Sequence, residues 1–125
     1  MTIKDVSEKY DISADTLRYY ERVGMIPSVH RTESGIRNYT EEDLSWVGLA
    51  ICMRSAGLPV EVMIEYLKLY QAGDSTIPAR LRLLTEQKEA LLEQRKSIDA
   101  TIDRLNYKIA RYEIAVETGK LSWEK

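Results

Sequence analysis

The sequence predicts a mainly α-helical protein in two parts, a small N-terminal domain of short helices with one hairpin and a long C-terminal coiled-coil helix. Two observations lead to this prediction. Helix-capping residues and glycine or proline breaks divide the N-terminal part into short segments. Further along, apolar residues recur at alternating steps of four and three over more than five heptads. We expect the domain over 1–73, the coiled coil over 74–118 and a tail over 119–125.

Composition places the chain among folded proteins. Of the 125 residues, 44% are hydrophobic and 30% are charged, a balance typical of globular rather than disordered chains. The longest apolar stretch, Trp46 to Met53, is too short to span a bilayer, and the first residues do not resemble a signal peptide. We therefore expect a cytoplasmic protein without a membrane partner. The single cysteine, Cys52, excludes an internal disulfide and a multi-cysteine metal site within one chain, and no cofactor is expected.

Two short helices joined by a tight turn are expected first. Thr2 and Asp5 form a capping pair for the first helix. Asp11 occupies the turn, where aspartate tolerates a left-handed backbone better than most residues other than glycine. Ser13 caps the second helix, and Gly24 ends it. Two helices connected in this way predict a helix-turn-helix.

A hairpin and two further helices are expected next. Residues 29–39 carry β-branched side chains on both sides of Gly35, which predicts a small hairpin with its turn at this glycine. Thr40 and the acidic residues after it supply an N-cap and a favourable first turn for a third helix. Pro59 is expected in the first turn of a fourth helix, where its missing N–H is not needed, and Gly73 ends that helix.

The heptads predict a coiled-coil helix over 77–116, roughly 60 Å long at about 1.5 Å per residue. Its apolar seam is too long for the small N-terminal domain to bury, so the seam predicts a homodimer. Lys88 and Arg95 occupy the same heptad position, one heptad apart. Their aliphatic stems can lie along the seam while the charged groups reach water. Alternatively, the two charges can fix the register of the paired helices. The pattern alone leaves both readings open, and also leaves parallel and antiparallel pairing open. The seam residues expected to carry dimerisation are Leu84, Leu91, Ile98, Ile102, Leu105 and Ile109.

Residues 13–39 concentrate side chains that suit nucleic-acid binding. Hydrogen-bonding and cationic groups on one short helix, with more on the adjacent hairpin, are typical of a groove reader that also holds phosphates. Arg18 is expected at a guanine edge or a phosphate, because a guanidinium suits both. The neighbouring Tyr20 is expected to pack inward. The residues expected to contact DNA are Thr16, Arg18, Tyr19, Arg31, Arg37 and Tyr39.

The overall charge argues against this interpretation. Residues 1–71 contain eight Lys or Arg and eleven Asp or Glu, a net charge of −3, whereas nucleic-acid modules are usually basic. Between Arg18 and Tyr39, however, four arginines face two glutamates, so the expected contact surface is locally positive. Binding should therefore be salt-sensitive and should benefit from dimerisation.

Five spaced segments match a known pattern: Thr16–Glu21, Gly24–Pro27, Arg31, Gly35–Tyr39 and Glu42–Leu44. In these residues, and in the order of its elements over nearly the whole chain, the sequence resembles the MerR family of bacterial transcription regulators. The resemblance implies a winged helix-turn-helix homodimer with an antiparallel coiled coil. It further implies binding to a pseudo-palindromic site in double-stranded promoter DNA and distortion of an over-long spacer, which affects RNA polymerase indirectly. Where Asp11 stands, the family often has glycine.

Cys52 has two interpretations. Its sequence neighbours are not cationic, which favours an inert, partly buried thiol. The chain is also similar to a small branch of the family without a separate effector domain, and in that branch a single cysteine in this region is the proposed sensor of aldehyde or thiol stress. The metal-sensing branches use several cysteines, and the multidrug branch has a large ligand domain that is not expected after Lys125.

Two other functional classes compete with a regulator. An enzyme is not expected, because one histidine and one cysteine without a phosphate-cradling loop form no catalytic constellation. The alternative is a coiled-coil adaptor or structural dimer without DNA-binding activity, which the acidic N-terminal half would suit. Steep salt dependence of duplex binding distinguishes the regulator from the adaptor.

Overall fold

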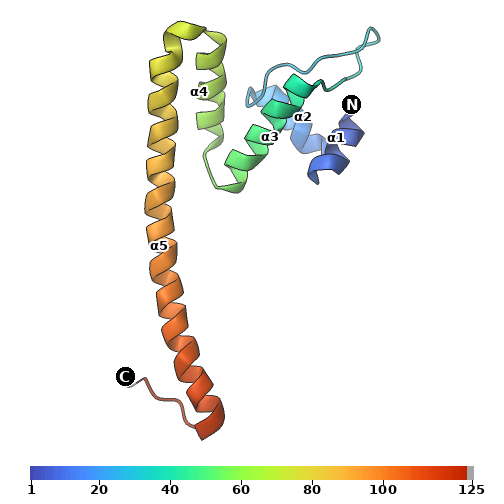
Figure 1. Ribbon diagram of the computed structural model, residues 1–125. Helices are drawn as coiled ribbons and strands as arrows, with labels where there is room; N and C mark the ends of the chain where they lie inside the picture. The colour runs from blue at the N-terminus through green and yellow to red at the C-terminus, as the bar shows by residue number, and fades with distance from the viewer. Residues whose placement is uncertain (124–125) are drawn as a thin grey trace. The chain divides into compact units, whose positions relative to one another are not determined.

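The computed structural model describes residues 1–123 and is predominantly helical (Figure 1). Two compact units divide the chain, Met1–Thr85 and a second that begins at Glu86, and the last helix contributes to both. The mainly α-helical class, the helix-turn-helix and the long C-terminal helix are confirmed. The elements are α1 (Ile3–Tyr10), α2 (Ala14–Val23), α3 (Glu41–Ser55), α4 (Val60–Gln71), the 3-10 turn η1 (Asp74–Thr76) and α5 (Ile77–Thr118).

The first two helices begin and end at the predicted capping residues. The Thr2 hydroxyl accepts the Asp5 N–H at 3.1 Å, and the Asp5 carboxylate accepts the Thr2 N–H at 3.1 Å. Asp11 takes the left-handed conformation at φ 51° and ψ 53°, so the turn forms without glycine. The Ser13 hydroxyl caps α2, and Gly24 ends it at φ 86°. These local interactions set where α2 begins relative to α1.

The core of the first unit lies among α1 to α4 and the segment between α2 and α3. Its fully buried side chains come from each of these four helices and from the segment between α2 and α3. The ring of Tyr20 belongs to it, which confirms that Tyr20 packs inward. No helix within residues 1–123 combines the length and apolarity needed to cross a membrane. The largest fully buried side chains are Leu17, Met25, Ile26, Met63, Val6 and Val47.

The wing, residues 28–39, forms a hairpin that is shorter than the sequence predicts. Its turn at Gly35 is confirmed, with φ 86° at the glycine and the Gly35 N–H donated to the Thr32 carbonyl at 2.9 Å. The described residues contain no β-strand, and the two arms form a single antiparallel bridge between Arg31 and Arg37. Two backbone bonds flank this bridge, from the Thr32 N–H to the Ile36 carbonyl at 2.8 Å and from the Asn38 N–H to the His30 carbonyl at 2.7 Å. The arms extend no further as a ladder because the His30 N–H is donated to the Asp43 carboxylate at 3.2 Å rather than to the opposite arm.

The third and fourth helices follow the predicted breaks with one difference. Thr40 and Asp43 form a reciprocal capping box at the start of α3. Pro59 is the N-cap of α4, one residue before the first turn in which it was expected, and its carbonyl accepts the Val62 N–H at 3.2 Å. The C-cap of α4 is Ala72, and Gly73, at φ 99°, comes directly after this cap.

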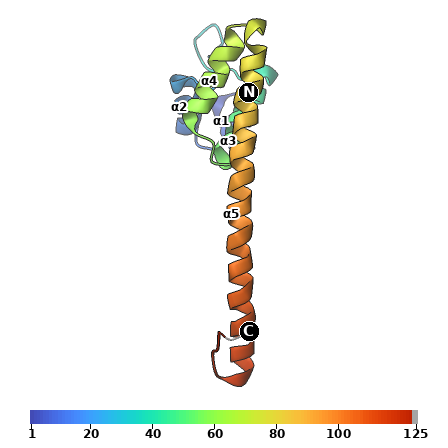
Figure 2. The same cartoon turned by 90° about the vertical axis from the view of Figure 1, so that its left-hand side faces the viewer.

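The start of α5 lies beside α4 (Figures 1 and 2) and uses a face other than the heptad seam. Arg80 donates to the Gly73 carbonyl at 3.1 Å, and its guanidinium lies 5.3 Å from the centroid of the Tyr70 ring. Leu83 on the same face is only 9% exposed, whereas the seam residue Leu84 is exposed. At the start of α5 the domain therefore leaves Leu84, a residue of the predicted seam, exposed.

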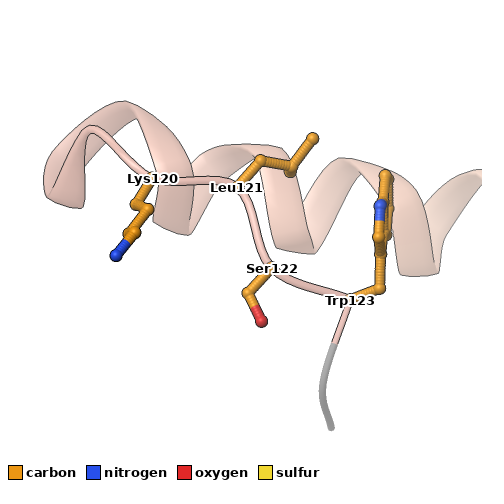
Figure 3. A pocket seen from close by; sticks show the side chains of 4 residues that line it. All are labelled: Lys120, Leu121, Ser122 and Trp123. Atoms are coloured by element: carbon orange, nitrogen blue, oxygen red, sulfur yellow. The ribbon is translucent and has the colours of Figure 1, made fainter.

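The second unit contains the rest of α5 and a segment that turns back along the end of the helix (Figure 3). Gly119, at φ 75°, allows the reversal. The Trp123 ring meets the Tyr112 ring edge-on at 5.7 Å between centroids, and Arg111 donates to the Ser122 carbonyl at 2.7 Å. The segment thus packs against the end of the predicted seam, to which Tyr112 belongs.

Candidate nucleic-acid interface

The outward face of α2 carries the three helix residues expected to contact DNA. Arg18 and Tyr19 are exposed and Thr16 is half-buried, while Leu17 is fully buried, as the helical period requires. Arg18 forms an ion pair with Asp15 at 2.9 Å, and both partners are exposed. An exposed pair of this kind contributes about 0–1 kcal/mol, so the guanidinium can exchange it for a phosphate or a base.

Glu21, on the same helix, joins α2 to both arms of the wing. Its side chain is only 11% exposed. Oε2 accepts the Val29 N–H from one arm at 2.9 Å, and Oε1 accepts Nε–H of Arg37 from the other arm at 2.8 Å. A terminal nitrogen of Arg31 lies 3.8 Å from the same Oε1. The two wing arginines therefore gather around one carboxylate.

The wing arginines differ in how firmly they are held. Arg31 donates to the Gly35 carbonyl at 3.0 Å across the turn, and its side chain is 43% exposed. The Arg37 side chain is 23% exposed and is tied to Glu21 by its ε nitrogen. A guanidinium has two further nitrogens in a rigid fork that matches a phosphate. The arrangement suits phosphate binding beside the reading helix.

Tyr39 was expected to contact DNA from the wing, and the structure places it in the core instead. Its side chain is 2% exposed, and within residues 1–123 its hydroxyl has no hydrogen-bond partner. The chain turns inward here because the Tyr39 N–H is donated to the Met1 carbonyl at 2.7 Å, directly before the N-cap of α3. Burial raises the pKa of the hydroxyl above its ordinary value. A buried phenol cannot reach a phosphate, so the prediction for Tyr39 is wrong.

Asp43 was predicted only as part of an acidic first turn, and the structure gives it a second role. It is 4% exposed and accepts the Thr40 N–H at 2.9 Å and the His30 N–H at 3.2 Å. Burial alone would raise the pKa of Asp43, but hydrogen bonds from the Thr40 backbone and from the His30 side chain and backbone outweigh burial and lower it. The sequence identified Thr40 as the N-cap and Asp43 as part of the acidic first turn, but carried no signal for the reciprocal capping box or for the bond to His30.

Cys52 lies late on α3 and is exposed, so the expectation of a partly buried thiol is wrong. Its backbone carbonyl accepts the Ser55 hydroxyl at 2.7 Å. Among the residues that the structure describes, no group of His, Cys, Asp and Glu is arranged to hold a metal ion.

Comparison with known proteins supports a nucleic-acid interface. Residues 1–69 match the family described as MerR HTH family regulatory protein. Over 93 residues the chain is 50% identical to the HTH-type transcriptional regulator AdhR of Bacillus subtilis, an alignment covering 74% of this chain and 66% of AdhR. It is 34% identical over 120 residues to an uncharacterized HTH-type transcriptional regulator of Haemophilus influenzae, covering 96% of this chain and 89% of that protein.

A solved structure extends the similarity to the fold. The crystal structure of HiNmlR, a MerR family regulator lacking the sensor domain, bound to promoter DNA, superimposes with a TM-score of 0.87 at 34% identity. The match covers 95% of this chain and 94% of HiNmlR. The likeness therefore includes both the helix-turn-helix and the long helix.

Proposed function

The chain belongs to the MerR family of helix-turn-helix regulators and is a DNA-binding transcriptional regulator, and from this premise we propose how its residues recognise a promoter. AdhR is a transcriptional regulator, and HiNmlR is seen on promoter DNA. These relatives favour a regulator over the adaptor without DNA-binding activity. We propose no catalytic activity and a cytoplasmic location, where a bacterial regulator meets the genome.

In our proposal α2 enters the major groove and the wing holds the neighbouring backbone. Arg18 and Tyr19 project from the helix, with Thr16 at its first turn. Arg31 and Arg37 bind phosphates and so set the register of the helix in the groove. The observation that carries this proposal is the exposure of Arg18 and Tyr19 on the helix to which Glu21 ties both wing arginines.

The long helix is proposed to pair two copies of the chain. Of the six dimerisation residues named from the sequence, Leu91 is half-buried and the other five are exposed in the single chain. Burying a Leu or Ile side chain fully is worth roughly 1.5–3 kcal/mol, so an apolar row of this length favours a second copy. The division into 1–73, 74–118 and 119–125 stays a prediction, with dimerisation assigned to the middle segment.

Pairing has a consequence for the DNA site. Two identical readers related by a two-fold axis require a pseudo-palindromic site whose half-sites match their separation. If the bound dimer bends or untwists the spacer, part of the binding free energy is used for deformation. RNA polymerase then responds to the shape of the promoter and is an indirect partner.

Cys52 is proposed as the point at which electrophiles act. Its exposure supports access by an aldehyde. A thiolate attacks the carbonyl carbon, the C=O π bond breaks to leave an alkoxide, and protonation of the alkoxide by water gives a hemithioacetal. The change at α3 would then alter how the reader sits on DNA.

The test is duplex binding by the purified protein, using fragments recovered from a genomic selection. We expect log K to fall steeply with log salt, and Arg18→Ala to weaken binding by about 10–100-fold, corresponding to roughly 1–3 kcal/mol. Arg104→Ala, which removes the same charge from α5 off the seam, is the matched control and should bind as the wild type does. Binding that is insensitive to salt and to Arg18→Ala would contradict the proposed reader.

A further inference from the structure

We propose that Glu21 is a positioning residue for DNA binding, one that strengthens the complex despite its negative charge. This inference rests on the proposed function, because it concerns how the wing arginines reach phosphates. An acidic residue beside a DNA-contacting surface ordinarily weakens binding, since it repels the phosphates. The geometry around Glu21 points to the opposite sign.

The two carboxylate oxygens of Glu21 serve two different arms of the wing. Oε2 accepts the Val29 N–H at 2.9 Å, which fixes the arm that leaves α2. Oε1 accepts Nε–H of Arg37 at 2.8 Å, which fixes the arm that returns to α3. The side chain is 11% exposed, so the bonds are shielded from water more than a surface ion pair would be.

The wing needs such an anchor because its own backbone pairing is slight. One antiparallel bridge joins the arms, and Arg31, which takes part in it, is exposed. An arginine side chain that is free to move loses rotamer entropy when it binds a phosphate. Glu21 removes part of that loss in advance for Arg37 and leaves the two terminal guanidinium nitrogens to form the phosphate contact.

Glutamine cannot replace the carboxylate at this position. Its amide has one acceptor oxygen, and its NH₂ group would face either the Val29 N–H or the Arg37 Nε–H, both of which are donors. Glu21→Gln therefore removes one negative charge and releases at least one arm of the wing. Electrostatics alone predicts tighter DNA binding for this variant, whereas loss of positioning predicts weaker binding.

Glu33 supplies a matched control within the same wing. It is exposed beside the turn, next to Ser34. Glu33→Gln removes the same charge, and the wing anchors at Val29 and Arg37 stay in place. On the duplex recovered by genomic selection with wild-type protein, we expect Glu33→Gln to bind equally well or up to about threefold tighter, as loss of a nearby repulsive charge implies.

For Glu21→Gln on the same duplex we expect binding to be about tenfold weaker. The slope of log K against log salt should be smaller by about one, because one ordered phosphate contact is lost. In an Arg37→Ala background, Glu21→Gln should have a much smaller effect, because the two residues act as a unit. A purely structural role would lower thermal stability without changing the salt slope. Circular dichroism should show unchanged helix content at the temperature of the assay.

Equal or tighter binding by Glu21→Gln, matching Glu33→Gln, would overturn the proposal. If Glu21→Gln does not fold, Glu21→Asp takes its place, because it keeps the charge and shortens the reach; wild-type affinity for Glu21→Asp would then overturn it. Failure of the proposed function would look different, since the wild-type protein itself would then bind the duplex without salt dependence.

Discussion

His30 Nδ1 lies 2.9 Å from Oδ2 of Asp43, so the wing is joined to the N-terminus of α3. The same oxygen accepts the Thr40 N–H at 2.9 Å, so one carboxylate caps the helix and holds the wing. Together with Glu21 on α2, Asp43 fixes the base of the wing from two helices. The position of the wing therefore depends on two acidic side chains within a domain that is acidic overall.

Asp43 makes the domain sensitive to acid. Its pKa is lowered in the folded protein, so its contribution to stability is full above the ordinary aspartate pKa of about 3.9 and is lost as the pH falls through the folded pKa. We expect Asp43→Asn to lower the melting temperature by several degrees at pH 7, from loss of roughly 1–2 kcal/mol, and by much less near pH 3. Melting curves followed by circular dichroism across this range provide the measurement.

Asp103→Asn is the matched control for Asp43, because it makes the same change at an exposed position of α5. Its melting temperature should follow that of the wild type at every pH. If Asp43→Asn were as stable as the wild type at pH 7, the hydrogen bonds of the Asp43 carboxylate to Thr40 and His30 would contribute nothing to the stability of the domain.

Tyr39→Phe tests whether the phenol belongs to the core or to the DNA surface. The hydroxyl is buried, and the described residues give it no partner, so its removal should leave stability unchanged or raise it by about 1 kcal/mol. Affinity for the duplex should not change. A large loss of affinity in a filter-binding or fluorescence assay, with the melting temperature unchanged, would return Tyr39 to the list of DNA contacts.

Ile102→Glu tests the dimer seam. Ile102 is 46% exposed in the single chain and lies on the heptad seam, where a buried carboxylate without a partner is strongly unfavourable. We expect sedimentation equilibrium to show dissociation to monomers at concentrations where the wild type is dimeric, and duplex affinity to fall with it. Ile114→Glu makes the same change at a residue of similar exposure, 49%, off the seam, and should remain dimeric.

Cys52→Ser tests the sensor. The wild-type protein should change its transcriptional output from the recovered promoter when an aldehyde is added, and Cys52→Ser should keep its basal output and lose the response. Serine is close to cysteine in size and lacks the nucleophilic thiol, and DNA binding without aldehyde provides the internal control. A full aldehyde response by the serine variant would remove Cys52 from the mechanism.

Sequence reasoning succeeded where the determining interaction is local. Thr2, Ser13 and Thr40 each cap a helix through residues three positions away, and the left-handed turn at Asp11 depends on the residue itself. It failed where the partner is distant. The burial of Tyr39 follows from pairing with Met1, 38 positions earlier. Periodicity within one helix could not reveal such pairings.

The candidate site divides in the same way. The helical period identified Arg18 as exposed and Tyr20 as buried, because the position of each side chain around α2 determines which face it lies on. Glu21 was part of the motif that carried the family resemblance, yet its role required knowing that the wing folds back onto α2. The surface exposure of Cys52 depended on how α3 packs in the domain, which neighbours along the helix do not determine.

Leu83 and Leu84 are adjacent in the chain but lie on different faces of α5, one buried and the other exposed on the seam. Substitutions at seam positions can therefore accumulate during evolution while the domain keeps its own packing. After a gene duplication, such drift would let each copy come to prefer itself as a partner before its DNA reader changes. The two regulators in one cell would then form homodimers and no mixed dimers, and the N-terminal domain of each would have remained folded throughout.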